Sequence, residues 1–105
     1  MPRRENKVTP KVISRVLYAD ESFALESLAW WQWLNLGRSF YVQMLDGGYT
    51  ARRELRRGSY FWYAFKRSAG KLYKVYIGRS HELTAARLSE VSSLMEGRIQ
   101  AAHNQ

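Results

Sequence analysis

The middle of the chain alternates between apolar and polar residues with a period of two, which is typical of β-strands. The pattern predicts strands over residues 39–45, 49–56, 60–67 and 71–77, and the turns between them contain glycine. The strand over 60–67 is the clearest of the four, because aromatic side chains dominate it and aromatic residues favour pleated sheets. Four such strands in succession predict an antiparallel meander.

Apolar residues recur at helical spacing on both sides of this meander. Residues 22–36 predict a short helix rich in tryptophan, with Ser22 as a possible cap and Gly37 as a stop signal. A second helix is predicted over 84–102, with Thr84 as its N-cap. Its apolar stripe consists of Leu88, Val91, Leu94, Met95 and Ile99.

The order of these elements predicts a single α+β domain over residues 21–105, preceded by an arm over residues 1–20. The expected architecture is an antiparallel meander of three to four strands that packs against the C-terminal helix, with the short Trp-rich helix before it. The arm carries a short apolar run around Val12 and Leu17, which is compatible with a short strand or with one helical turn. We expect the arm to be ordered only if it finds a partner or a groove.

Alternation also assigns side chains to the two faces of the sheet. The more apolar face carries Val75 and Ile77, so we expect it to lie under the C-terminal helix together with Trp62 and Ala64. The other face would then present Tyr63, Phe65, Arg67, Lys74 and Tyr76, with arginines from residues 49–56 alongside. This assignment assumes a hairpin register that the sequence alone does not determine. The Trp-rich helix could also cover the second face.

Positive charge is concentrated in one part of the chain. The net charge is +8, and residues 49–79 hold nine lysines and arginines against a single acid, Glu54. A positive field of this kind attracts a polyanion such as a nucleic acid. Arginine and lysine neutralise phosphates, arginine can read guanine edges, and aromatic side chains can stack on bases or pack on sugars.

Several other classes of function are disfavoured by the composition. The chain has no cysteine, which excludes disulfides and thiolate metal sites, and its two histidines, His81 and His103, are far apart in the sequence. No phosphate-binding glycine motif is present, and no tyrosine is marked as an activated nucleophile. We therefore predict a non-enzymatic protein without a cofactor or a metal. No signal peptide or membrane span is expected, which suits a cytoplasmic location.

The segment over residues 49–91 also resembles a small bacterial module with the pattern G-x-Y-x-W-Y-A, then G-K-L-x-K-x-Y-[IL]-G. That module occurs alone or beside LuxR-type transcriptional regulators and near mobile-element genes. The resemblance implies a regulatory or mobile-element accessory role. The matching residues are Gly58, Tyr60, Trp62, Tyr63, Ala64, Phe65, Lys66, Gly70, Lys71, Leu72, Lys74, Tyr76, Ile77, Gly78, Arg79, Ser80, Leu83, Thr84, Arg87 and Leu88.

A second, more distant resemblance suggests how the chain would contact DNA. Strands ending in Y-I-G, followed by a polar turn and an amphipathic helix, resemble the DNA-binding domain of plant ethylene-response factors and the arm-binding domains of tyrosine integrases. In both families an open sheet face lies in the DNA major groove. The likeness and the basic sheet together imply that the candidate contacts are Arg52, Arg56, Tyr63, Lys66, Arg67, Lys71, Lys74, Tyr76 and Arg79.

The functional prediction is therefore binding of double-stranded DNA through the sheet. Two alternatives stay open. One is a protein-interaction module that docks on a larger regulator or an acidic partner, with Trp30, Trp31 and Trp33 as the contact patch. The other is binding of RNA or single strands, for which exposed aromatic rings would matter more than arginines.

Overall fold

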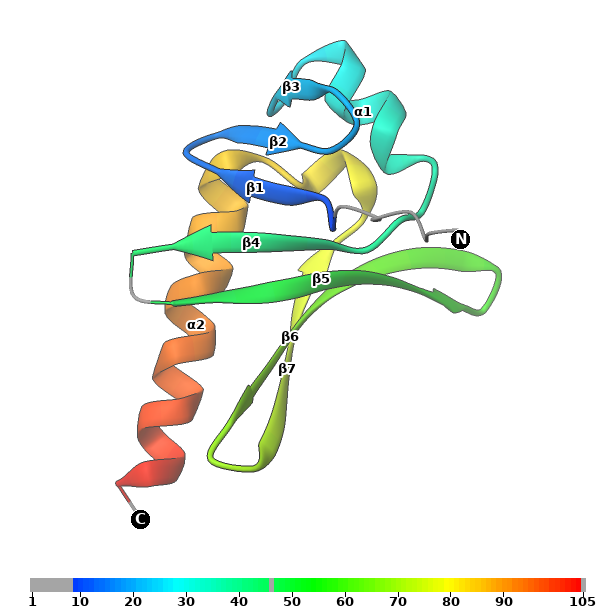
Figure 1. Cartoon of the computed structure of the whole chain (residues 1–105). Helices are drawn as coiled ribbons and strands as arrows, with labels where there is room; N and C mark the ends of the chain where they lie inside the picture. The colour runs from blue at the N-terminus through cyan, green and yellow to red at the C-terminus, as the bar shows by residue number, and fades with distance from the viewer. Residues whose placement is uncertain (1–8, 46, 105) are drawn as a thin grey trace, which may run out of the picture.

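A single mixed sheet dominates the computed structural model, which describes residues 9–45 and 47–104 (Figure 1). Seven strands form the sheet in the order β3-β2-β1-β4-β5-β6-β7. Two α-helices and a short 3-10 helix, η1 (Ser80–Glu82), complete the described chain. The strands are β1 (Lys11–Ile13), β2 (Val16–Tyr18), β3 (Ser22–Ala24), β4 (Phe40–Met44), β5 (Gly47–Arg56), β6 (Ser59–Ser68) and β7 (Lys71–Gly78).

The predicted meander is confirmed in β4 to β7, in which every strand pairs antiparallel with the next. Two-residue turns join β5 to β6 and β6 to β7. Arg57 and Gly58 form the first turn, Ala69 and Gly70 form the second, and all four residues have positive φ between 52° and 81°. This is the type I′ geometry, which matches the twist of a hairpin and for which glycine carries no steric cost.

The sheet is larger than the predicted meander, because residues 11–24 add three short strands to it. β1 pairs parallel with β4, and β2 and β3 then extend the sheet antiparallel. Val12 and Leu17, which belong to the apolar run of the predicted arm, are buried in the core. The first eight residues of that arm, and Asp46 of the predicted turn before β5, lie outside the described residues.

The predicted N-terminal helix is shorter than expected. Helix α1 spans Leu28–Leu34, since Ser22–Ala24 pairs with β2 as a strand instead of starting the helix. Ser27, not Ser22, is the N-cap, and its hydroxyl accepts a hydrogen bond from the Trp30 backbone N–H at 3.2 Å. The C-terminal helix agrees closely with the prediction, because α2 spans Ala85–His103 and the Thr84 side chain caps it.

The core lies between the sheet and the two helices. Trp30 of α1, Phe40 of β4 and Trp62 of β6 form an aromatic chain with ring centroids 5.5 and 5.4 Å apart. Trp30 also donates its indole N–H to the Leu83 carbonyl at 3.0 Å, which ties α1 to the segment before α2. Both helices therefore pack on the face that carries Phe40 and Trp62.

A buried tyrosine fastens α2 to the same face of the sheet. The hydroxyl of Tyr49 donates to the Leu88 carbonyl at 2.7 Å, and the Tyr49 side chain is almost wholly buried. Burial raises the pKa of this hydroxyl well above its ordinary range. Within the described part of the chain, neither helix is long and apolar enough to cross a membrane.

Candidate functional site

The face of β5, β6 and β7 that points away from α1 and α2 carries five of the nine basic residues of the segment 49–79, and it is called the open face below. The pairing register brings its side chains into rows, with Arg52 opposite Tyr63 and Tyr63 opposite Tyr76. This confirms that the predicted second face is a single surface. The Trp-rich helix, which the sequence left as a possible cover for it, packs on the opposite face with Phe40 and Trp62. The open face includes Thr50, Arg52, Glu54, Arg56, Phe61, Tyr63, Phe65, Arg67, Leu72, Lys74, Tyr76 and, beyond the end of β7, Arg79.

The cations of the open face lie over its aromatic rings. The Arg52 guanidinium carbon is 4.3 Å from the centroid of the Phe65 ring, and the Lys74 ammonium is 4.3 Å from the centroid of Tyr63. Arg56 lies 5.4 Å from that same Tyr63 ring. Cation–π attraction of this kind orients long side chains that would otherwise be free to rotate. The aromatic rings of the open face therefore lie beneath charged groups. Phe65 is only 9% exposed, although it lies on the open face.

Glu54 is the acid within this cluster. One of its carboxylate oxygens accepts hydrogen bonds from Arg56 at 2.8 Å and from Lys74 at 3.1 Å. The hydrogen bond from Arg56, and then the one from Lys74, hold the pKa of the Glu54 carboxyl below its usual range, so the group is ionised at neutral pH. Glu54 therefore neutralises part of the charge of two of the candidate contacts.

Arg79 reaches the open face because the sheet is irregular there. Tyr63 pairs with Tyr76, but the preceding residue, Trp62, pairs with Gly78, which leaves one extra residue on β7. A bulge of this kind reverses the alternation of side chains beyond it. The guanidinium of Arg79 consequently lies 5.0 Å from the centroid of the Phe61 ring on the open face. Strict alternation would have placed it on the side of Val75.

Lys66 and Lys71 are the two candidate contacts that the structure does not bring to the open face. Lys66 pairs with Tyr73 and points toward α2, where it forms an ion pair with Glu96. The ammonium of Lys71 lies 5.3 Å from the centroid of the Tyr73 ring, which is also on the helix side. The alternation along β6 already predicts this position, because Lys66 is an even number of residues from the buried Trp62 and so points to the same face.

Replacing Lys66 with glutamine is therefore expected to leave affinity for nucleic acid within about twofold of the wild type, apart from the small general effect of one charge. The variant should instead lose about 1 kcal/mol of unfolding free energy, because the partner of Glu96 is removed. Denaturant unfolding and duplex binding, measured on the same preparation, check both expectations. A tenfold loss of binding with normal stability would contradict the assignment of Lys66 to the helix side.

The tryptophans of α1 do not form an exposed patch. Trp30 is fully buried, Trp33 is 7% exposed and stacks on Trp30 at 6.3 Å, and only Trp31 remains half-buried at the surface. A docking surface made of all three tryptophans would require α1 to leave the core. The structure thus removes Trp30 and Trp33 from the surface available to a protein partner.

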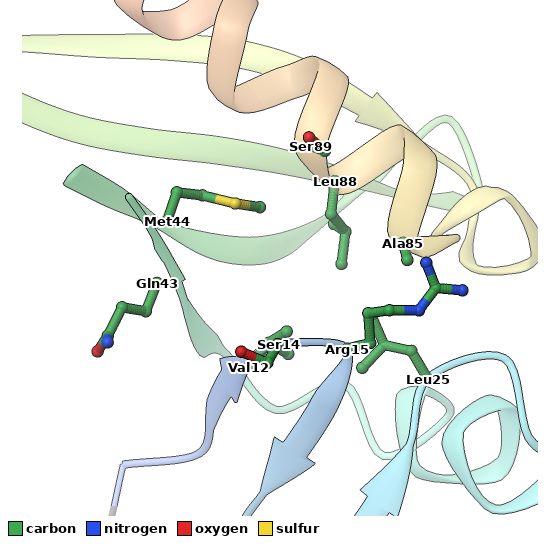
Figure 2. A pocket seen from close by; sticks show the side chains of 9 residues that line it. All are labelled: Val12, Ser14, Arg15, Leu25, Gln43, Met44, Ala85, Leu88 and Ser89. Atoms are coloured by element: carbon green, nitrogen blue, oxygen red, sulfur yellow. The ribbon is translucent and has the colours of Figure 1, made fainter. Parts of the chain in front are cut away.

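Hollows also lie on the surface of the molecule. One of about 260 Å³ lies on the helix side between β1, β4 and the start of α2, and Figure 2 shows the side chains around it. Its lining is largely apolar, and its one charged side chain, Arg15, reaches toward Ala85 of α2. Among the residues that the structure describes, no three His, Cys, Asp or Glu side chains come together in a way that could hold a metal ion.

No protein-family model, curated protein or solved structure matches this chain. The geometry and charge of the open face are therefore the basis of the proposed function.

Proposed function

We propose that this chain is a non-enzymatic protein that binds double-stranded DNA through the open face. The observation that carries the proposal is the distribution of charge. Five cations, Arg52, Arg56, Arg67, Lys74 and Arg79, lie on the side of the sheet that neither helix covers, with Glu54 as the acid among them. A two-stranded β-ribbon fits the major groove of B-DNA, where side chains reach both phosphates and base edges.

The contacts between cations and rings favour duplex DNA over single strands. A protein that binds single strands needs ring faces on which bases can stack. On the open face, Tyr63 is approached by both Lys74 and Arg56, and Phe65 by Arg52. Tyr76, at 45% exposure, is the aromatic side chain that extends furthest into solvent on this face. Such a surface suits a regular array of phosphates, with Tyr76 packing against sugar or base.

The resemblance of residues 49–91 to a module found beside transcriptional regulators and mobile-element genes supports a regulatory or accessory role for this binding. A cytoplasmic location, where DNA is accessible in bacteria, belongs to the same proposal.

Glu54 offers a test in which binding should improve. Replacing it with glutamine removes the acid from the open face and frees Arg56 and Lys74. Affinity for duplex DNA at low salt is expected to rise about fivefold, which corresponds to about 1 kcal/mol. Glu90→Gln is the matched control, because Glu90 is an exposed acid on α2 and its loss changes the net charge equally. An equal gain in both variants would mean that net charge alone, and not the open face, governs binding.

The class of nucleic acid is tested by fluorescence anisotropy with labelled duplex and single-stranded oligonucleotides at two salt concentrations. We expect duplex to bind more tightly, and affinity to fall steeply as salt rises, because bound phosphates release their counterions. Tighter binding of the single strand would instead favour stacking on the aromatic rings. Absence of binding at low salt would refute the proposed function.

A further inference from the structure

A second hollow, of about 470 Å³, lies where α1, the start of β6 and η1 meet, at the end of the sheet that carries Arg79. Aromatic rings, amide groups and basic side chains contribute to its lining, and none of the residues that line it is acidic. The side chains that matter for its chemistry are Trp31, Gln32, Asn35, Tyr60, Arg79 and His81.

Hydrogen bonds from two buried indoles hold the walls of this hollow in place. Trp30 donates to the Leu83 carbonyl at 3.0 Å, which fixes α1 against the residue that follows η1. Trp62 donates to the Ser80 hydroxyl at 2.8 Å, which fixes η1 against the sheet. The Glu82 carboxylate also accepts from the Arg79 backbone N–H at 2.7 Å. A preformed hollow loses little conformational entropy when a ligand binds.

Arg79 connects this hollow to the open face. Its guanidinium lies 5.0 Å from the centroid of the Phe61 ring on the open face, and the same residue lines the hollow. A DNA strand that follows the cations of the open face as far as Arg79 would therefore arrive at the entrance of the hollow.

We propose that the hollow binds the base of an unpaired nucleotide at the end of a duplex that lies on the open face, an inference that rests on the proposed function. Trp31 supplies the ring surface for stacking. The half-exposed Tyr60 adds an apolar edge and a hydroxyl beside it, since Arg53 lies over the Tyr60 ring at 3.8 Å from its centroid. The amides of Gln32 and Asn35 each present a donor and an acceptor, as the hydrogen-bonding edges of bases require. The absence of acids from the lining suits a ligand that brings a phosphate with it.

The test compares a blunt duplex of about two helical turns with the same duplex carrying a short single-stranded overhang at the 5′ or the 3′ end. The wild type is expected to bind one of the overhang duplexes about tenfold more tightly than the blunt duplex, a ratio that stacking of a single base can supply. Trp31→Leu should abolish this preference, and Gln32→Ala should reduce it to about threefold. Affinity for the blunt duplex should stay unchanged in both variants.

Gln100→Ala is the matched control, because Gln100 is an exposed glutamine on α2, away from the hollow, and the variant should keep the full preference. Gln32 is exposed as well, so its replacement does not depend on the contacts that Trp31 makes with the core. Equal affinity of the wild type for blunt and overhang duplexes would overturn this inference and leave the proposed function intact. A preference that survives in both hollow variants would also overturn it. If the wild type bound neither blunt nor overhang duplexes, the proposed function and this inference would both be refuted.

Discussion

Replacing Arg52 and Arg67 with glutamine is expected to weaken binding of duplex DNA about a hundredfold at low salt. Both side chains are exposed on the open face, and neither makes an ion pair with an acid in the described part of the chain. Each is thus available for a phosphate, and a hydrogen bond to a charged group contributes roughly 1.5 kcal/mol or more. The slope of the logarithm of affinity against the logarithm of salt concentration is negative, and it should become less negative by about two.

The control for this double variant changes the same amount of charge on the helix side. Arg15 lines the hollow beside Ala85 of α2, and Arg38 lies 5.8 Å from the centroid of the Trp33 ring. Glutamine at these two positions is expected to reduce affinity by less than about fivefold, through the general field alone. Similar losses in the two double variants would mean that binding does not use the open face. A lower melting temperature of the Arg52/Arg67 variant would assign those side chains a structural role.

Replacing Trp62 with alanine is expected to destabilise the fold by about 3–5 kcal/mol, a large fraction of the stability of a small domain. Trp62 is fully buried, packs 5.4 Å from the Phe40 ring and donates its indole N–H to Ser80. The alanine variant would leave a large cavity between β6 and the helices, and it would release η1 from the sheet. Urea unfolding monitored by circular dichroism gives the change in the free energy of unfolding directly.

Tyr76→Ala provides the comparison for Trp62 on the opposite face of the sheet. Tyr76 is 45% exposed and contacts Tyr63 with ring centroids 5.5 Å apart. The substitution is expected to lower the free energy of unfolding by only about 1 kcal/mol, although it removes the most exposed aromatic ring of the open face. A stable Trp62→Ala variant that has merely lost DNA binding would reverse the assignment of the two faces.

The sequence predicts elements that depend on interactions between residues close together in the chain, and it misses those that depend on residues far apart. Strands β4 to β7 were predictable because alternation, glycine turns and adjacent pairing are all local signals. Strands β1 to β3 were not, because each has only three residues and β1 depends on a parallel partner, β4, that lies beyond α1 in the chain. Periodicity cannot distinguish such short apolar runs from a helical turn.

Alternation along the strands predicted most of the open face, and the features that it did not predict depend on how neighbouring strands pair. Alternation separated Tyr63 and Tyr76 from Trp62 and Val75, and the register of the β6–β7 hairpin confirms that separation. Lys66 became a candidate contact through the resemblance, although alternation already placed it with Trp62. The bulge that carries Arg79 to the open face, and the stacking of cations on rings, depend on cross-strand register, which the sequence alone does not specify.

The most direct test of the open face as the DNA interface uses ¹⁹F NMR of protein labelled with fluorotyrosine. The seven tyrosines sample both sides of the sheet, with Tyr63 and Tyr76 on the open face and Tyr49 and Tyr73 toward α2. On titration with a short duplex, the resonances of Tyr63 and Tyr76 are expected to shift, while those of Tyr49 and Tyr73 stay in place. Shifts confined to Tyr49 and Tyr73, or duplex binding that leaves Tyr63 and Tyr76 unaffected, would contradict the assignment of the open face as the DNA-binding surface.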